Sequence, residues 1–145
     1  MESTDEQILG LLARDGRMSY TDIGKATGLS TSAAQQRVRR LEQRGVITGY
    51  KAVIDPGSLG KMLTAFVSLR TNSPHEDADL PELLADLPDI VSCYSVAGRA
   101  SYLLMVQVAT PLDLERLLND IGHRAGVSTE TQLVLSVPYA DRPAV

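Results

Sequence analysis

The stretch LSTSAAQQRVRRLEQRG, residues 29–45, contains four of the fourteen Lys and Arg residues of the chain and only one acid. The chain as a whole is acidic, with a net charge of −4 over 145 residues. Ser30 is a typical helix N-cap and Gly45 a typical stop, so the stretch is predicted to form a helix. Core packing alone does not require this positive charge, which therefore indicates a negatively charged partner.

The predicted helix has faces of different chemistry when it is read at 100° per residue. Ala34, Val38 and Leu41 share a narrow stripe with Gly45, and this stripe is expected to face the core. The other faces carry hydroxyls and amides near the N-terminus and guanidiniums further along. Such a helix can enter the major groove of DNA, with its first residues at base edges and its later arginines at phosphates. The predicted DNA contacts are Ser19, Thr31, Ser32, Gln35, Gln36, Arg39, Arg40 and Arg44.

Arg37 has a different position on this helix, at the edge of the core stripe. It is interpreted as an internal strut, tied to an acid of the same domain such as Asp5 or Asp15 rather than to DNA. The alternative for the whole polar face is a solvated surface that carries an ion pair between Arg39 and Glu42.

The residues before this helix predict two shorter helices. One is expected from the cap Thr4 to a stop at Gly16, and the next from the cap Ser19 to Gly28. A short helix, a glycine-containing turn and a longer helix together form the layout of a helix-turn-helix.

A change of composition then divides the chain. The segment VITGYKAVID, residues 46–55, alternates in the manner of a strand and is followed by a Pro-Gly turn. The first fifty residues carry a net charge of +1 and the remainder −5. This division predicts a DNA-binding domain over 1–51, a linker over 52–61 and a second domain over 62–145.

The second domain has the pattern βαββαβ. This order predicts a ferredoxin-like α+β fold, in which a four-stranded antiparallel sheet has both helices on one face. The helices share the string D-L-x-x-L-L-x-D, beginning at Asp79 and at Asp113. A polar loop is expected over 71–79. The predicted strands are 62–70, 90–97, 101–109 and 127–137, and the predicted helices are 79–86 and 113–120.

The second face of the sheet needs a cover. Phe66, Tyr94 and Met105 are expected on strands of this small domain, where exposure would make them an aggregation risk. We therefore expect a homodimer through this domain, which would also supply the paired half-sites that helix-turn-helix proteins use.

Other classes of protein find little support in the residues. A lone cysteine, Cys93, excludes an internal disulfide. The two histidines, His75 and His123, lack partners at metal-ligand spacing, and no nucleotide-binding or hydrolase motif occurs. No metal or cofactor is therefore expected. No apolar run reaches the roughly 20 residues of a membrane span, and the N-terminus lacks a basic signal region, so the expected location is the cytoplasm.

Together, four strings resemble the Lrp/AsnC (feast/famine) family of transcription regulators. They are DEQILGLLARDGRMSYTDIGKATGLS, RVRRLEQRGVITGYKAVIDP, VAGRASYLLMV and GVSTETQLVLS, and they extend over nearly the whole chain. The resemblance implies a winged helix-turn-helix that binds double-stranded DNA and is joined by a strand to a ligand-binding domain called RAM. It also implies dimers that assemble into octamers, with amino acids as frequent effectors.

The same resemblance implies an effector site at the turn before the third strand and at the start of the last strand. Family members read G-x-x-D-Y at the turn, where this chain has Ser101 in place of the aspartate. A serine offers no carboxylate to an α-ammonium group, although Arg99 can meet a carboxylate. The implied effector contacts are Val96, Gly98, Arg99, Ser101, Tyr102, Ser128, Thr129, Glu130 and Thr131.

Two alternatives to a DNA-binding regulator stay open on the sequence. Some haem-pathway decarboxylases resemble this family in fold, which leaves an enzyme possible, although only Arg99 is a candidate for the cleft chemistry. The other alternative is an effector-binding protein or adaptor without DNA regulation, and the polar outward face of the third helix argues against it.

Overall fold

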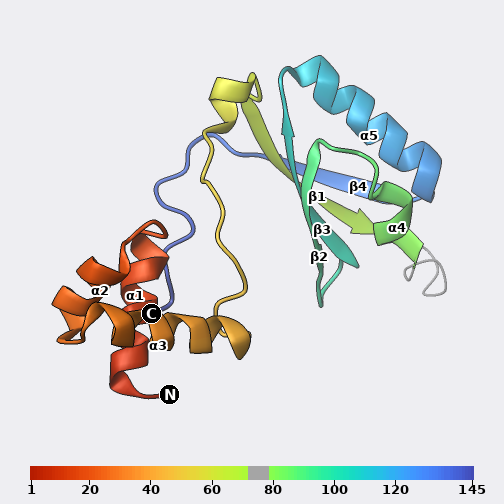
Figure 1. Cartoon of the computed structure of the whole chain (residues 1–145). Coiled ribbons are helices and arrows are strands. Elements are labelled where there is room, and N and C mark those ends of the chain that lie inside the picture. The colour runs from red at the N-terminus through yellow and green to blue at the C-terminus, as the bar shows by residue number, and fades with distance from the viewer. Residues whose placement is uncertain (72–78) are drawn as a thin grey trace. The chain divides into compact units, whose positions relative to one another are not determined.

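The computed structural model describes residues 1–71 and 79–145, which pack into two compact units (Figure 1). One unit comprises Met1–Val53 together with Tyr139–Val145, and the other comprises Ile54–Pro138. The last seven residues thus pack with the helical unit, although the sequence pattern assigned them to the second domain.

The helical unit contains α1 (Ser3–Arg14), α2 (Tyr20–Thr27) and α3 (Thr31–Gln43). The predicted caps of α2 and α3 are confirmed. The side-chain oxygens of Ser19 and Ser30 accept hydrogen bonds of 3.1 Å from the backbone N–H groups of Asp22 and Ala33. Each bond satisfies a donor at the helix start that would otherwise lack a partner.

The turn between α2 and α3 depends on two glycines. Gly28 ends α2 in the left-handed region, with φ of 76°. Gly24 lies so close to the turn that a Cβ at this position would be 2.5 Å from the carbonyl oxygen of Leu29. The absence of a side chain at Gly24 therefore allows α2 and the start of α3 to approach each other.

The predicted apolar stripe of α3 forms the core of this unit. Ala34, Val38 and Leu41 are buried and pack with Ile8 of α1 and Ile23 of α2. Gly45 was expected on the same stripe, but it is exposed beyond the helix end and has φ of 73°.

The predicted ends of α1 and the strand after α3 were wrong. Glu2, not Thr4, occupies the N-cap position, and α1 ends at Arg14 with an extended Asp15, so Gly16 is not its cap. Residues 46–55 form no strand, because the described chain provides them with no neighbouring strand to pair with. Val53 is 94% exposed as a result.

The second unit has the predicted ferredoxin-like topology. Its four antiparallel strands have the order β2-β3-β1-β4, and both helices pack against the same buried face. A short 3-10 helix, Pro56–Leu59, precedes them. The elements are β1 (Leu63–Arg70), α4 (Leu80–Leu84), β2 (Ile90–Ser95), β3 (Tyr102–Val108), α5 (Pro111–Ala125) and β4 (Ser128–Leu133).

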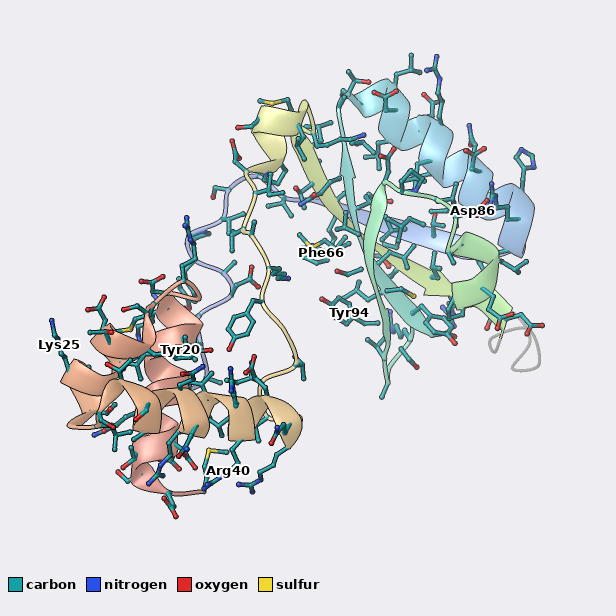
Figure 2. The ribbon with its side chains drawn as sticks, viewed as in Figure 1. Tyr20, Lys25, Arg40, Phe66, Asp86 and Tyr94 are labelled. Carbon is teal, nitrogen blue, oxygen red and sulfur yellow. The ribbon has the colours of Figure 1, made fainter. Side chains whose placement is uncertain are left out.

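The strands present one face to the helices and leave the other open. Val67 of β1 and Leu104 of β3 are register partners, are fully buried, and pack in one cluster with Ile121 of α5. Phe66 pairs with Met105 on the opposite face. Figure 2 shows Phe66 and Tyr94 on the side of the sheet away from the helices.

All four strands and α4 are shorter than predicted, and α5 is longer. The helix at 79–86 covers only Leu80–Leu84. The last strand stops at Leu133, because its pairing with β1 ends where the backbone N–H of Val134 donates to Thr64. The part of the polar loop at 72–78, with His75, lies outside the described residues.

Candidate nucleic-acid interface

The predicted reading face of α3 is exposed to solvent. Gln35 is half-buried, and the remaining predicted contacts are exposed. Arg40 extends from α3 in Figure 2. The exposed members are Ser19, Thr31, Ser32, Gln36, Arg39, Arg40 and Arg44.

Hydroxyl groups are concentrated at the start of α3. The Oγ atoms of Ser30 and Ser32 lie 3.4 Å apart. The Oγ1 atoms of Thr21 and Thr31 lie 3.3 Å apart and join α2 to α3. Hydroxyls can both donate and accept, so this helix start can serve base edges or phosphate oxygens.

The arginines of the reading face form no salt bridge within residues 1–71 and 79–145. This holds for Arg39, Arg40 and Arg44, and the alternative pair between Arg39 and Glu42 is not formed among those residues. Guanidiniums that are not engaged by carboxylates can approach phosphates, and neutralising phosphates supplies most of the affinity for DNA.

Arg37 is tied to α1, as predicted for an internal strut. Its Nη1 atom lies 3.4 Å from Asp5 Oδ1 and 2.6 Å from Glu2 Oε2. These hydrogen bonds, first to Glu2 and then to Asp5, raise the pKa of Arg37 above its ordinary value. The partner Asp5 is confirmed and Asp15 is not the partner.

Glu2 was missed by the sequence interpretation. It precedes Asp5 by three positions, and residues at this spacing lie on one side of a helix. This spacing could have indicated that Glu2, like Asp5, is placed to pair with Arg37.

Tyr50 was also missed. A Cβ at Gly16 would lie 3.8 Å from the Tyr50 ring, which brings this tyrosine back to the turn after α1. Partial burial, followed by the charge of Glu42 near the end of α3, raises the pKa of the Tyr50 phenol. The phenol is therefore a neutral donor at the edge of the helical unit.

The predicted effector turn lies between β2 and β3. Gly98 has φ of 139°, a conformation that side chains rarely adopt, and the backbone N–H of Val96 donates to the Ser101 carbonyl at 3.1 Å. The backbone N–H of Ser101 donates to Leu69 O at 2.8 Å, and its hydroxyl lies 3.4 Å from Thr71 Oγ1. An open cavity of about 300 Å³ is lined by Ser95, Val96, Ala97, Gly98, Ala100, Ser101 and Tyr102.

The strand register brings the two predicted halves of the effector site to one end of the sheet. Tyr102 of β3 and Thr129 of β4 both pair with Leu69 of β1, from opposite sides. Residues 128–130 are exposed and Thr131 is half-buried. Arg99 does not line the cavity at the turn.

Neither a candidate metal-binding group nor a helix able to span a membrane is found among the described residues. Among them, no group of three His, Cys, Asp or Glu residues is placed to hold a metal ion. None of their helices combines the length and apolar character that crossing a membrane requires.

Two family models match the chain. The AsnC-type helix-turn-helix domain matches residues 1–42, and the Lrp/AsnC ligand binding domain matches residues 64–144. The first match contains the three helices of the helical unit up to residue 42, and the second contains all four strands.

Curated and solved proteins agree with this match. The HTH-type transcriptional regulator LrpA of Mycobacterium tuberculosis is 42% identical, over 98% of this chain and 95% of the relative. The HTH-type transcriptional regulator FL11 of Pyrococcus horikoshii is 31% identical, over 93% of this chain and 89% of the relative. The solved feast or famine regulatory protein of M. tuberculosis, complexed with L-methionine, superposes with a TM-score of 0.92 at 42% identity and covers 98% of this chain and 97% of that one. The chain therefore belongs to the Lrp/AsnC family.

Proposed function

We propose that this protein is a sequence-specific transcriptional regulator that binds double-stranded DNA through α3. The observation that carries the proposal is the exposed polar face of α3. Arg39 and Arg40 on this face and Arg44 at its C-cap form no salt bridge within the described part of the chain. Ser32, Gln36 and Arg39 would contact base edges, together with the half-buried Gln35. Arg40 and Arg44 would contact phosphates.

A binding measurement over a salt series tests this assignment. The operator is first selected from a random duplex library with the full-length protein. Arg40→Ala should weaken binding to all sequences and reduce the slope of log affinity against log salt by about 1. Arg39→Ala should lose about 1–3 kcal/mol and relax the preference at one base position.

Arg116→Ala provides the matched control for these two variants. Arg116 is an exposed arginine of α5 whose side chain is 69% exposed, so its replacement removes the same charge from the other unit. Its affinity and salt slope should equal those of the wild type. If both α3 variants also behave as the wild type does, the assignment of α3 is wrong.

We propose further that the protein acts as a homodimer that can assemble to an octamer. The open sheet face supports a dimer, since Tyr94 is 51% exposed and Phe66 and Met105 lie on the same side without a covering helix. Apolar faces of this kind are rarely left to solvent in stable proteins. The octamer rests on the family alone.

An amino acid is the proposed class of effector. The support is the cavity at the turn before β3 and the L-methionine complex of the M. tuberculosis relative. In this chain the turn contributes the Ser101 hydroxyl in place of the carboxylate usual in the family. Contacts are proposed for the nine residues named for the turn and for β4.

The proposed role is regulatory rather than enzymatic, and the proposed location is the cytoplasm. The curated relatives carry the names of transcriptional regulators.

A further inference from the structure

The chain returns to the helical unit after its last strand. Tyr139–Val145 packs with Met1–Val53, whereas 134–138 belongs to the sheet unit. In Figure 1 the C-terminal end of the chain lies beside the helices of the helical unit. The helical unit is therefore connected to the sheet unit at two points of the chain, once after Val53 and once before Tyr139.

One guanidinium joins this terminal segment to α1. Arg14 Nη1 donates to the carbonyl oxygen of Gly10 at 2.7 Å, which fixes the side chain along its own helix. Arg14 Nη2 donates to the main-chain oxygen of Val145 at 3.3 Å. A charged donor that bonds two carbonyl groups gives a contact stronger than a neutral hydrogen bond.

The surface of α1 that receives the segment lies away from the core of the unit. Gly10 is 200° around the helix from the buried Ile8, yet Gly10 is itself buried, and a Cβ there would lie 3.1 Å from Arg14 Nη1. An open groove of about 880 Å³ has both α1 residues, such as Gln7 and Leu11, and the terminal residues Ala144 and Val145 in its walls.

The segment has a local structure of its own. Among the described residues other than glycine, only Asp141 has a positive φ, at 55°. The guanidinium of Arg142 lies 3.8 Å from the centre of the Tyr139 ring, a cation–π contact. The positive φ of Asp141 and the contact of Arg142 with Tyr139 thus occur within the same short segment.

We propose that Tyr139–Val145 is a C-terminal latch that seats on α1 and gives the DNA-binding unit a second, releasable attachment to β4. The hydrogen bond from Arg14 is solvent-exposed, and Val145 remains 48% exposed, so the contact is weak enough to open. β4 carries the proposed effector contacts and leads through 134–138 directly into the latch. Effector binding at β4 can therefore reach α1 along a route that does not involve the linker at 52–61.

Hydrogen exchange of the full-length protein tests whether the latch seats on α1. Deletion of residues 139–145 should speed the exchange of the α1 amides at residues 10–14 by about five- to tenfold, with β1 unchanged. Arg14→Gln should have the same effect, because it removes the charged donor and keeps the length of the chain. Arg17→Gln is the matched control and should leave these amides at the wild-type rate.

The exchange measurement tests the latch alone, whereas a second measurement, of DNA affinity, also rests on the proposed function. Equal exchange at residues 10–14 in the wild type, the deletion and Arg14→Gln would overturn the latch. The second readout is DNA affinity, which should fall about three- to tenfold on deletion, since a freer unit loses more entropy on binding. If the wild type binds no DNA while the exchange differences are found, the proposed function fails and the latch stands.

Discussion

Arg37 on α3 and Asp5 on α1 lie within 3.4 Å of each other, and Asp5 is only 6% exposed. One arginine of the helix proposed to bind DNA thus forms ion pairs within its own unit. It sets the position of α3 on α1, while neighbouring arginines of the same helix keep their charge for an outside partner. Arginines on different sides of α3 thus have different roles, because Arg37 faces α1 and the other arginines face solvent.

Replacing Arg37 should therefore affect stability and not phosphate contact. Arg37→Gln removes the charge that faces Asp5 and Glu2, so the melting temperature should fall by a few degrees. The salt slope of DNA binding should stay at the wild-type value. Arg40→Ala should show the reverse, with an unchanged melting temperature and a smaller slope. A reduced slope in Arg37→Gln would instead make Arg37 a phosphate contact.

Gly24→Ala should destabilise the helical unit by about 1–3 kcal/mol. The new Cβ would lie 2.5 Å from the carbonyl oxygen of Leu29, and a backbone atom cannot move aside as a flexible side chain can. Denaturant unfolding measures the change. Gly122→Ala on α5 is the matched control, because nothing lies within 4 Å of its Cβ. That helical substitution should stabilise the protein by about 0.5–1 kcal/mol.

Tyr94→Arg should weaken the proposed dimer. Tyr94 is 51% exposed on the open face of the sheet, and a charge there would have to be buried without a partner when two copies associate. Light scattering over a concentration series should show the variant dissociating at higher concentration than the wild type. Leu112→Arg on α5, where Leu112 is 53% exposed, should leave the assembly unchanged. Identical association of both variants would remove the sheet face as the interface.

Ser101→Asp should strengthen the response to amino acids. The substitution supplies a carboxylate for an α-ammonium group at the turn between β2 and β3. The backbone of this turn is held in place by hydrogen bonds that join Ser101 to Val96 and to Leu69. In a thermal-shift screen of the twenty amino acids, the variant should show a larger rise in melting temperature than the wild type for at least one of them. Ser136→Asp, at an exposed serine beyond β4 that is not among the proposed effector contacts, is the control for added charge alone. No rise in either protein would exclude an amino acid as the ligand of this turn.

Cys93 should react slowly with iodoacetamide at neutral pH. Cys93 is exposed, but partial desolvation by its neighbours raises the pKa of its thiol, so at a given pH less thiolate is present in the folded protein than in the unfolded one. Because the folded-state pKa is raised, this thiol contributes stability that is fully present below its unfolded pKa and is lost as the pH rises through the folded-state pKa. The alkylation rate should rise with pH and level off at a higher pH in the folded protein than in denaturant, and it should be faster in denaturant at neutral pH. Equal rates with and without denaturant at pH 7 would contradict the shift.

The sequence predicted those features that depend on neighbours along the chain. The caps Ser19 and Ser30 were correct because a capping side chain bonds a backbone group three residues away. The stripe of Ala34, Val38 and Leu41 was correct because helix geometry alone places these residues on one side. The order βαββαβ was sufficient for the sheet, since few topologies accommodate it.

The ends of α1 were wrong at the local level, but the other failed predictions concern distant parts of the chain. Alternation at 46–55 is typical of a strand, but pairing requires a neighbour, and the described residues provide none. β4 is shorter than the alternating pattern of the sequence predicts, because its hydrogen bonds to β1 end at Thr64. The spacing of Glu2 from Asp5 indicates a shared side of α1, but only the packing of α1 on α3 brings Glu2 to Arg37, a contact over 35 positions.

The sequence by itself determined the helical and sheet elements, the apolar faces they bury and the separation of arginines by phase around α3, since these follow from backbone periodicity and local hydrogen bonds. Only the tertiary structure decided which carboxylates engage Arg37, which end of the sheet carries both halves of the proposed effector site, and that Val145 meets Arg14. These contacts join residues far apart along the chain. Their formation depends on how packed elements meet in space, which no local pattern encodes.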